Sequence, residues 1–214
     1  MKQNNNLMHT KALAFGVLFL FTCFFTTFSF AQTGNQAKQI LDKTAAVLSR
    51  KGGASASFQL SNAKMGKVSG TIAIKGNKFH AATPQAIVWF NGKTQWTYLK
   101  KTEEVNVTNP TQAQQMMMNP YTFINIYKTG YVMTASTASN SYEVHLKAQN
   151  NKRTIQEMYI TVDKKTYVPL TVKMRQQKAW TTISISNFKG VNQPASLFVF
   201  NSKEFPGAEV VDLR

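Results

Sequence analysis

The chain has 214 residues, of which 43% are hydrophobic, and a formal net charge of +16. Its single cysteine, Cys23, lies in an N-terminal apolar run, so the rest of the chain has neither a disulfide nor a thiol nucleophile. A strongly basic protein can bind anionic lipid headgroups, acidic glycans or nucleic acid. Here the lysines are scattered singly along predicted strands, which favours a solvated basic surface over a dedicated anion site.

The N-terminus has the pattern of a secretory signal peptide. Lys2 and Lys11 form a basic region, residues 12–28 are apolar, and Ser29-Phe30-Ala31 resembles a signal peptidase site. We therefore predict a signal peptide at 1–31 and one domain at 32–214 with a net charge of +14, because both lysines leave. A retained membrane anchor is one alternative. A lipoprotein acylated at Cys23 is another, disfavoured because Thr22 stands where that processing prefers a small residue.

Residues 35–50 form the first predicted element, an amphipathic helix ended by Gly52-Gly53. After the helix the apolar period becomes two, which indicates strands. Asn91-Gly92 predicts a tight hairpin, and Asp163-Lys164-Lys165-Thr166 a second turn. Strands are expected at 57–61, 68–75, 78–83, 87–90, 94–99, 104–108, 131–136, 141–148, 154–162, 168–175, 180–188 and 197–200.

A segment without charged residues, 105–127, interrupts the strands. Asn109-Pro110 and Asn119-Pro120 each place a capping residue before a proline, which predicts two short helices at 110–118 and 120–127. The predicted class is therefore α+β and mainly antiparallel β. We expect about eleven strands in an unclosed, half β-barrel, because a flat sheet of that size is unfavourable. The N-terminal helix and the helical insert would cover its open mouth.

Residues for catalysis are sparse. Beyond residue 31 the histidines are His80 and His145, and Glu103-Glu104 would point to opposite faces of a strand. No nucleophile elbow, zinc-protease motif, phosphate-binding loop or dinucleotide fingerprint occurs. The two histidines could still meet in space as a metal or catalytic pair, but single strand histidines are more often surface or hydrogen-bonded residues. We predict no enzyme, no metal and no cofactor.

The apolar faces of the strands are either a filled core or the wall of a hydrophobic cavity. Methionines suited to variable apolar partners and an uncharged insert favour the cavity. The candidate wall residues are Phe58, Leu60, Ile72, Ile74, Trp89, Trp96, Ile160, Val172, Met174 and Ile183. The candidate lid residues are Ile40, Leu41, Leu48, Met116, Met117, Phe123, Ile124, Ile126 and Tyr127.

Three stretches carry a family resemblance. Residues 87–98, Ile-Val-Trp-Phe-Asn-Gly-Lys-Thr-Gln-Trp-Thr-Tyr, followed by 104–107, resemble a strand, an Asn-Gly-Lys-Thr turn and a Trp-x-Tyr return strand. Residues 70–75 with 78–79 resemble the preceding hairpin, and 198–200 with 206–212 the C-terminal strands. In these stretches and in its order of elements the chain is similar to the periplasmic outer-membrane lipoprotein carriers, the LolA family.

The resemblance implies an unclosed barrel whose cavity carries the acyl chains of lipoproteins from the inner to the outer membrane. It also implies a periplasmic monomer that meets an inner-membrane lipoprotein-releasing ABC transporter, an outer-membrane acceptor and, transiently, a membrane surface, but no nucleic acid. The family's lid-latching arginine has no counterpart, since its position falls at Gly76-Asn77.

Two other functions compete with the carrier. One is a related module that binds lipid or anionic glycan without a carrier cycle, through its lysines. The other is an enzyme acting on lipid, which would depend on His80 or His145.

Overall fold

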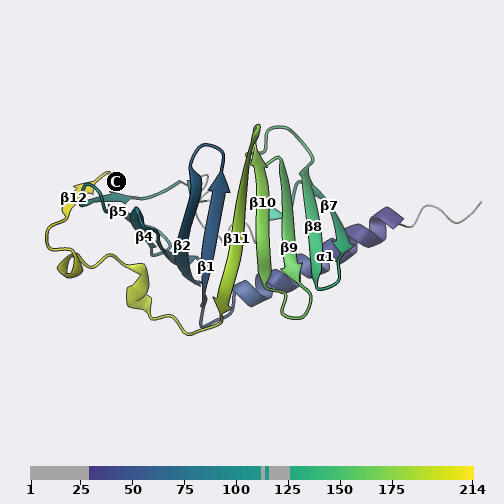
Figure 1. Cartoon of the computed structure of the whole chain (residues 1–214), viewed down its shortest axis with the longest axis horizontal. Coiled ribbons are helices and arrows are strands. Elements are labelled where there is room, and N and C mark those ends of the chain that lie inside the picture. The colour runs from purple at the N-terminus through teal and green to yellow at the C-terminus, as the bar shows by residue number, and fades with distance from the viewer. Residues whose placement is uncertain (1–28, 112–113, 116–125) are drawn as a thin grey trace, which may run out of the picture.

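The computed structural model describes residues 29–111, 114–115 and 126–214 (Figure 1). The described part of the chain begins with helix α1, Ser29–Leu48. Its strands are β1 (Ala54–Asn62), β2 (Gly66–Lys75), β3 (Lys78–Ala82), β4 (Ala86–Phe90), β5 (Gln95–Leu99), β6 (Glu104–Thr108), β7 (Tyr131–Thr137), β8 (Ser141–Ala148), β9 (Glu157–Asp163), β10 (Pro169–Gln176), β11 (Ala179–Lys189) and β12 (Glu209–Asp212). Two short 3-10 helices, η1 (Ala195–Phe198) and η2 (Ser202–Glu204), precede β12.

The twelve strands of the described residues form one sheet, in the order β12-β6-β5-β4-β3-β2-β1-β11-β10-β9-β8-β7. Every neighbouring pair is antiparallel except β12 and β6, which run parallel. Strands β12 and β7 end the sheet and do not pair with each other, so the sheet is unclosed. The predicted class, a mainly antiparallel half-barrel with an N-terminal helix, is confirmed, with twelve strands where about eleven were expected.

Both predicted turns form, and their polar side chains explain why. In the turn between β4 and β5, Asn91 Oδ1 accepts hydrogen bonds from the backbone N–H groups of Lys93 (3.0 Å) and Thr94 (2.8 Å). Gly92 there has a φ of +99°, which a residue without a Cβ adopts at no steric cost. In the turn between β9 and β10, Asp163 Oδ1 accepts from the N–H of Thr166 at 2.8 Å and from its hydroxyl at 2.7 Å.

Helix α1 packs along one face of the β7–β10 half of the sheet, and in Figure 1 it runs behind these strands. Its buried residues Ala37, Ile40 and Leu41 join a core with β8, β9 and β10. The helix begins at Ser29 rather than at residue 35 and ends at Leu48. Among the described residues, none of the helices has the length and hydrophobicity that crossing a membrane requires.

The prediction of a strand at 197–200 is wrong. Residues 195–198 form η1, which contacts β3 and β4, and Phe198 is fully buried. Phe198 and Phe200 alternate with other residues because their side chains pack against the sheet, although the segment that carries them is not a strand of it. The last strand is β12, which begins at Glu209 and pairs with β6.

The predicted helical insert lies largely outside the described residues. Gln114, Gln115 and Ile126 are helical, whereas 112–113 and 116–125 are not described. The two strands that this connection joins lie far apart in the sheet. Strand β6 belongs to one half of the sheet and β7 ends the other half, so residues 109–130 lead from one side of the open barrel to the opposite edge.

Candidate functional site: a cavity on the inner face of the sheet

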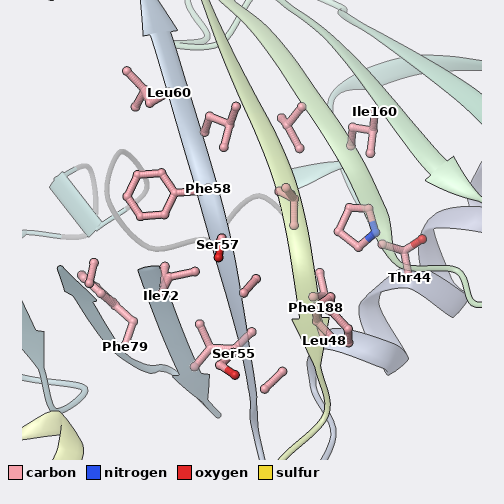
Figure 2. A pocket seen from close by; sticks show the side chains of 18 of the residues that line it. Thr44, Leu48, Ser55, Ser57, Phe58, Leu60, Ile72, Phe79, Ile160 and Phe188 are labelled. Atoms are coloured by element: carbon pink, nitrogen blue, oxygen red, sulfur yellow. The ribbon is translucent and has the colours of Figure 1, made fainter. Parts of the chain in front are cut away.

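A cavity of about 350 Å³ lies between α1 and the inner face of the sheet (Figure 2). Two rows of laterally paired residues run along its wall. One row runs Ile160, Val172, Ile183, Leu60 across β9, β10, β11 and β1. The other runs Ala56, Ile72, Ala81, Val88 across β1 to β4. The remaining lining residues are Leu41, Thr44, Leu48, Ala54, Ser55, Ser57, Phe58, Ile74, Phe79, Tyr127, Pro169, Ile185 and Phe188.

The wall spans seven neighbouring strands, from β4 to β9. Adjacent strands lie about 4.8 Å apart, so six spacings give a path of about 29 Å along the sheet. One leaflet of a bilayer has a hydrocarbon depth of about 15 Å, half of the ~30 Å core. The wall is therefore long enough for an acyl chain laid across the strands.

The lining is apolar. None of the described residues that form it is charged. The hydroxyl of Tyr127 donates to Asp42 Oδ1 at 2.5 Å. Thr44 Oγ1 is the one buried side-chain polar atom without a hydrogen-bond partner among the described residues. A surface of this kind excludes water in favour of hydrocarbon and offers few hydrogen bonds to a polar ligand.

Seven of the ten predicted wall residues lie in this lining: Phe58, Leu60, Ile72, Ile74, Ile160, Val172 and Ile183. Trp89 and Trp96 do not. They pair with each other on the opposite face of the sheet, where Trp89 also pairs with His80. Trp89 contacts Phe200 and Phe205 there at ring-centroid distances of 5.4 and 5.5 Å. Because residues 87–90 are apolar on both faces, their alternation does not reveal which side faces inward.

Met174 also lies outside the lining. It pairs with Met158 of β9, which pairs with Leu146 of β8, and all three are buried in the core beneath α1. This part of the inner face is filled, whereas the part nearer β1 is hollow. A strand pattern shows that a residue points inward but not whether a helix covers it there.

The predicted lid residues divide into three groups. Leu41, Leu48 and Tyr127 line the cavity, whereas Ile40 and Ile126 are buried in the core beside it. Met116, Met117, Phe123 and Ile124 lie outside the described residues.

The sequence reading missed the small residues that leave the space. Ala54, Ala56 and Ala81 occupy inward positions at which a larger side chain would fill the cavity. Gly70 pairs with Phe58, and a Cβ at Gly70 would lie 2.8 Å from Cζ of the Phe58 ring. Ala54 and Ala56 stand at the same alternate positions of the strand as Phe58 and Leu60, and this pattern could have predicted that they also face inward.

Comparison with known proteins decides the family. The family model described as outer membrane lipoprotein carrier protein LolA matches residues 27–178. The chain belongs to the LolA family. No curated protein sequence matches it.

One solved structure supports the fold of this LolA family member. A conserved protein from Thermus thermophilus aligns with a TM-score of 0.57 at 13% identity, covering 83% of this chain and 99% of that one. Two other structures are less similar. A LolA superfamily protein from Nitrosomonas europaea has a TM-score of 0.42 and 9% identity, covering 77% of this chain and 97% of that one. A DUF1329 family protein from Desulfovibrio piger has a TM-score of 0.47 and 10% identity, covering 78% of this chain and 97% of that one.

The family's arginine latch has no counterpart among the contacts of the described residues. Its position falls in the turn between β2 and β3, where Gly76 has a φ of +58°. Helix α1 is joined to the end of the β6–β7 connection by the Asp42–Tyr127 hydrogen bond, and Lys38 Nζ contacts the other oxygen of Asp42 at 2.7 Å.

The two histidines do not meet. His80 lies on β3 against Trp89, and burial lowers its pKa. His145 lies on β8, six strands away, and its Nε2 is 2.9 Å from Glu157 Oε1. No group of acidic residues, histidines and cysteines within the described ranges could hold a metal ion.

Proposed function

We propose that this protein is an exported carrier that holds the acyl chains of lipoproteins or lipids in the cavity and moves them from the inner to the outer membrane. The observation that supports the carrier is the apolar cavity, which spans seven strands and has no charged side chain among the described residues of its lining. Its volume falls within the range of ~300–1,000 Å³ typical of ligand sites.

The energetics of transfer suit such a site. Moving an acyl chain out of water is worth about 0.8 kcal/mol per CH₂, hence on the order of 10 kcal/mol for a long chain. A chain cannot leave one membrane for another unless a comparable apolar environment receives it. Leucine, isoleucine and phenylalanine side chains supply dispersion contacts without directional bonds, so the hold can be released to an acceptor of similar hydrophobicity.

The rest of the proposal follows from this role. Residues 1–31 would be removed as a secretion signal, and residues 32–214 would act in the periplasm as one non-enzymatic, monomeric domain. An inner-membrane lipoprotein-releasing ABC transporter would load the carrier and an outer-membrane acceptor would empty it. Transient contact with a membrane surface would accompany each step, and neither nucleic acid nor a cofactor is involved.

Two measurements test the carrier. Mass spectrometry of the protein purified from the periplasm should detect co-purifying lipid or acylated protein. The delipidated protein should then take up a fluorescent acyl chain with an affinity that depends little on salt. Steeply salt-dependent binding to vesicles or glycan, with no uptake of the acyl chain, would instead favour a surface-binding module. Turnover of a lipid ester that His80→Ala or His145→Ala abolishes would contradict the non-enzymatic assignment.

A further inference from the structure

Lys43 and Tyr167 form a hydrogen-bonded pair that lies outside the cavity lining but adjoins it in sequence on the α1 side. Each lies close in sequence to a lining residue, Lys43 beside Thr44 and Tyr167 two residues before Pro169. Lys43 Nζ donates to the Tyr167 hydroxyl at 3.1 Å and lies 4.7 Å from the ring centroid. Figure 2 shows Thr44 on the α1 side of the cavity, with Phe58 and Phe79 on the other side.

The pair has spare hydrogen-bond donors. A lysine ammonium has three N–H groups, and Lys43 gives one of them to Tyr167. The Tyr167 oxygen accepts that bond, so its own proton remains available to an acceptor. The bond from Lys43 lowers the pKa of Tyr167, which makes its O–H a stronger donor. These groups therefore present donors, rather than acceptors, beside an apolar cavity.

The backbone and the neighbouring side chains hold Tyr167 in place. Its φ of +56° is a conformation that bulky residues adopt rarely and at a cost in strain. Its ring stacks against Tyr142 at 6.1 Å, and Lys164 Nζ lies 5.6 Å from the Tyr142 ring centroid. Lys43 therefore contacts Tyr167 itself, and Lys164 contacts the ring of its stacking partner Tyr142.

The two nearby carboxylates are already engaged. Asp42 accepts hydrogen bonds from Lys38 and Tyr127. Asp163 accepts three bonds within its own turn, from Lys165 and Thr166. Neither carboxylate is in an ion pair with Lys43 among the described residues, so the charge of Lys43 is not neutralised by a salt bridge.

We propose that Lys43 and Tyr167 bind an anionic group, a carboxylate or a phosphate, at the end of an acyl chain that lies in the cavity. The inference rests on the proposed function and narrows its ligand to anionic amphiphiles. The chain would run from Thr44 and Ile160 across β10, β11 and β1 towards Val88, and the charged oxygens would stay outside the apolar lining.

Binding of three ligands to the delipidated protein tests this: palmitate, hexadecyl phosphate and the uncharged methyl palmitate. Displacement of a neutral fluorescent acyl probe, measured above pH 7, gives each affinity. We expect both anions to bind at least about tenfold more tightly than the ester, the size of a charge-assisted hydrogen bond. Lys43→Met should remove this preference without changing the affinity for the ester, and Tyr167→Phe should reduce it.

Lys147→Met is the matched control, because Lys147 is exposed on β8 outside the cavity lining and its loss changes the net charge equally. Equal binding of acid and ester by the unmodified protein, or a preference that survives Lys43→Met, would overturn the inference and leave the carrier intact. If Lys147→Met also lost the preference for the anions over the ester, the preference would come from the net charge of the protein, and the inference would again be overturned. Inorganic phosphate should not displace the probe; if phosphate bound Lys43 without an acyl chain, the site would be independent of the cavity. Failure of all three ligands to bind would refute the carrier as well.

Discussion

The hydroxyl of Tyr127 lies 2.5 Å from Oδ1 of Asp42, a hydrogen bond that joins the β6–β7 connection to α1 at the edge of the cavity. Removing it with Tyr127→Phe should lower the free energy of unfolding by about 1 kcal/mol. Urea denaturation measures the loss. Tyr98→Phe is the control, because the Tyr98 hydroxyl has no hydrogen bond among the described residues and its ring remains against Phe205 at 4.8 Å. Equal losses in both variants would contradict a specific role for the bond.

The same bond predicts a dependence on pH. Hydrogen bonds from Lys38 and Tyr127 lower the pKa of Asp42 below its ordinary value. Its contribution to stability is therefore complete above about pH 4 and is lost as the pH falls through the folded pKa. Asp42→Asn should flatten the acid limb of the stability curve. Because the Asp42 side chain is 44% exposed, solvent screening limits the effect to less than about 1 kcal/mol.

Filling the cavity should abolish acyl-chain binding without unfolding the protein. Ala56→Phe adds a ring to the inner wall between Phe58 and Ile72, and the cavity has room for added volume. We expect at least about a tenfold loss of acyl-chain affinity with an unchanged or higher melting temperature. Ala179→Phe at an exposed position of β11 controls for added hydrophobicity. Tight binding by the Ala56 variant would place the chain elsewhere.

Glu157 should stabilise the outer face of the β8–β10 region. Burial raises the pKa of Glu157, but hydrogen bonds from Arg175, His145 and Tyr159 outweigh burial and lower it overall. Glu157→Gln should cost about 1–2 kcal/mol at neutral pH. Because the folded pKa is lowered, this difference should shrink as the pH falls below about 4. Glu143→Gln, exposed on β8, should cost little; a similar loss there would indicate a general charge effect.

Phe205 should hold the C-terminal segment on the sheet. Its ring contacts those of Trp89, Tyr98 and Phe200 at centroid distances of 5.5, 4.8 and 5.5 Å. Phe205→Ala should remove these contacts, speed amide hydrogen exchange in β12 and shift the tryptophan emission to longer wavelength, while acyl-chain affinity stays unchanged. Val199→Ala, 43% exposed in the same segment, should leave the exchange unaltered. Protection of β12 in the Phe205 variant would contradict this role.

Local patterns were enough to predict most of the strands and much of the cavity wall. Phe58 and Leu60 alternate cleanly with polar residues, so their inward direction could be predicted, and the Asn-Gly turn placed β4 beside β5. Trp89 could not be placed, because both faces of β4 are apolar and the covering rings of Phe200 and Phe205 come from more than a hundred residues away. The parallel pairing of β12 with β6 is equally non-local.

The two long-range pairings of the sheet have a consequence for how the chain is made. Strand β1 is completed by β11, and β6 by β12, so these early strands keep open edges until residues 179–212 have been synthesised. Pairings of this separation close slowly. A newly made molecule therefore passes through an interval in which its early strands can aggregate, and holdase chaperones that shield these strands should increase its yield.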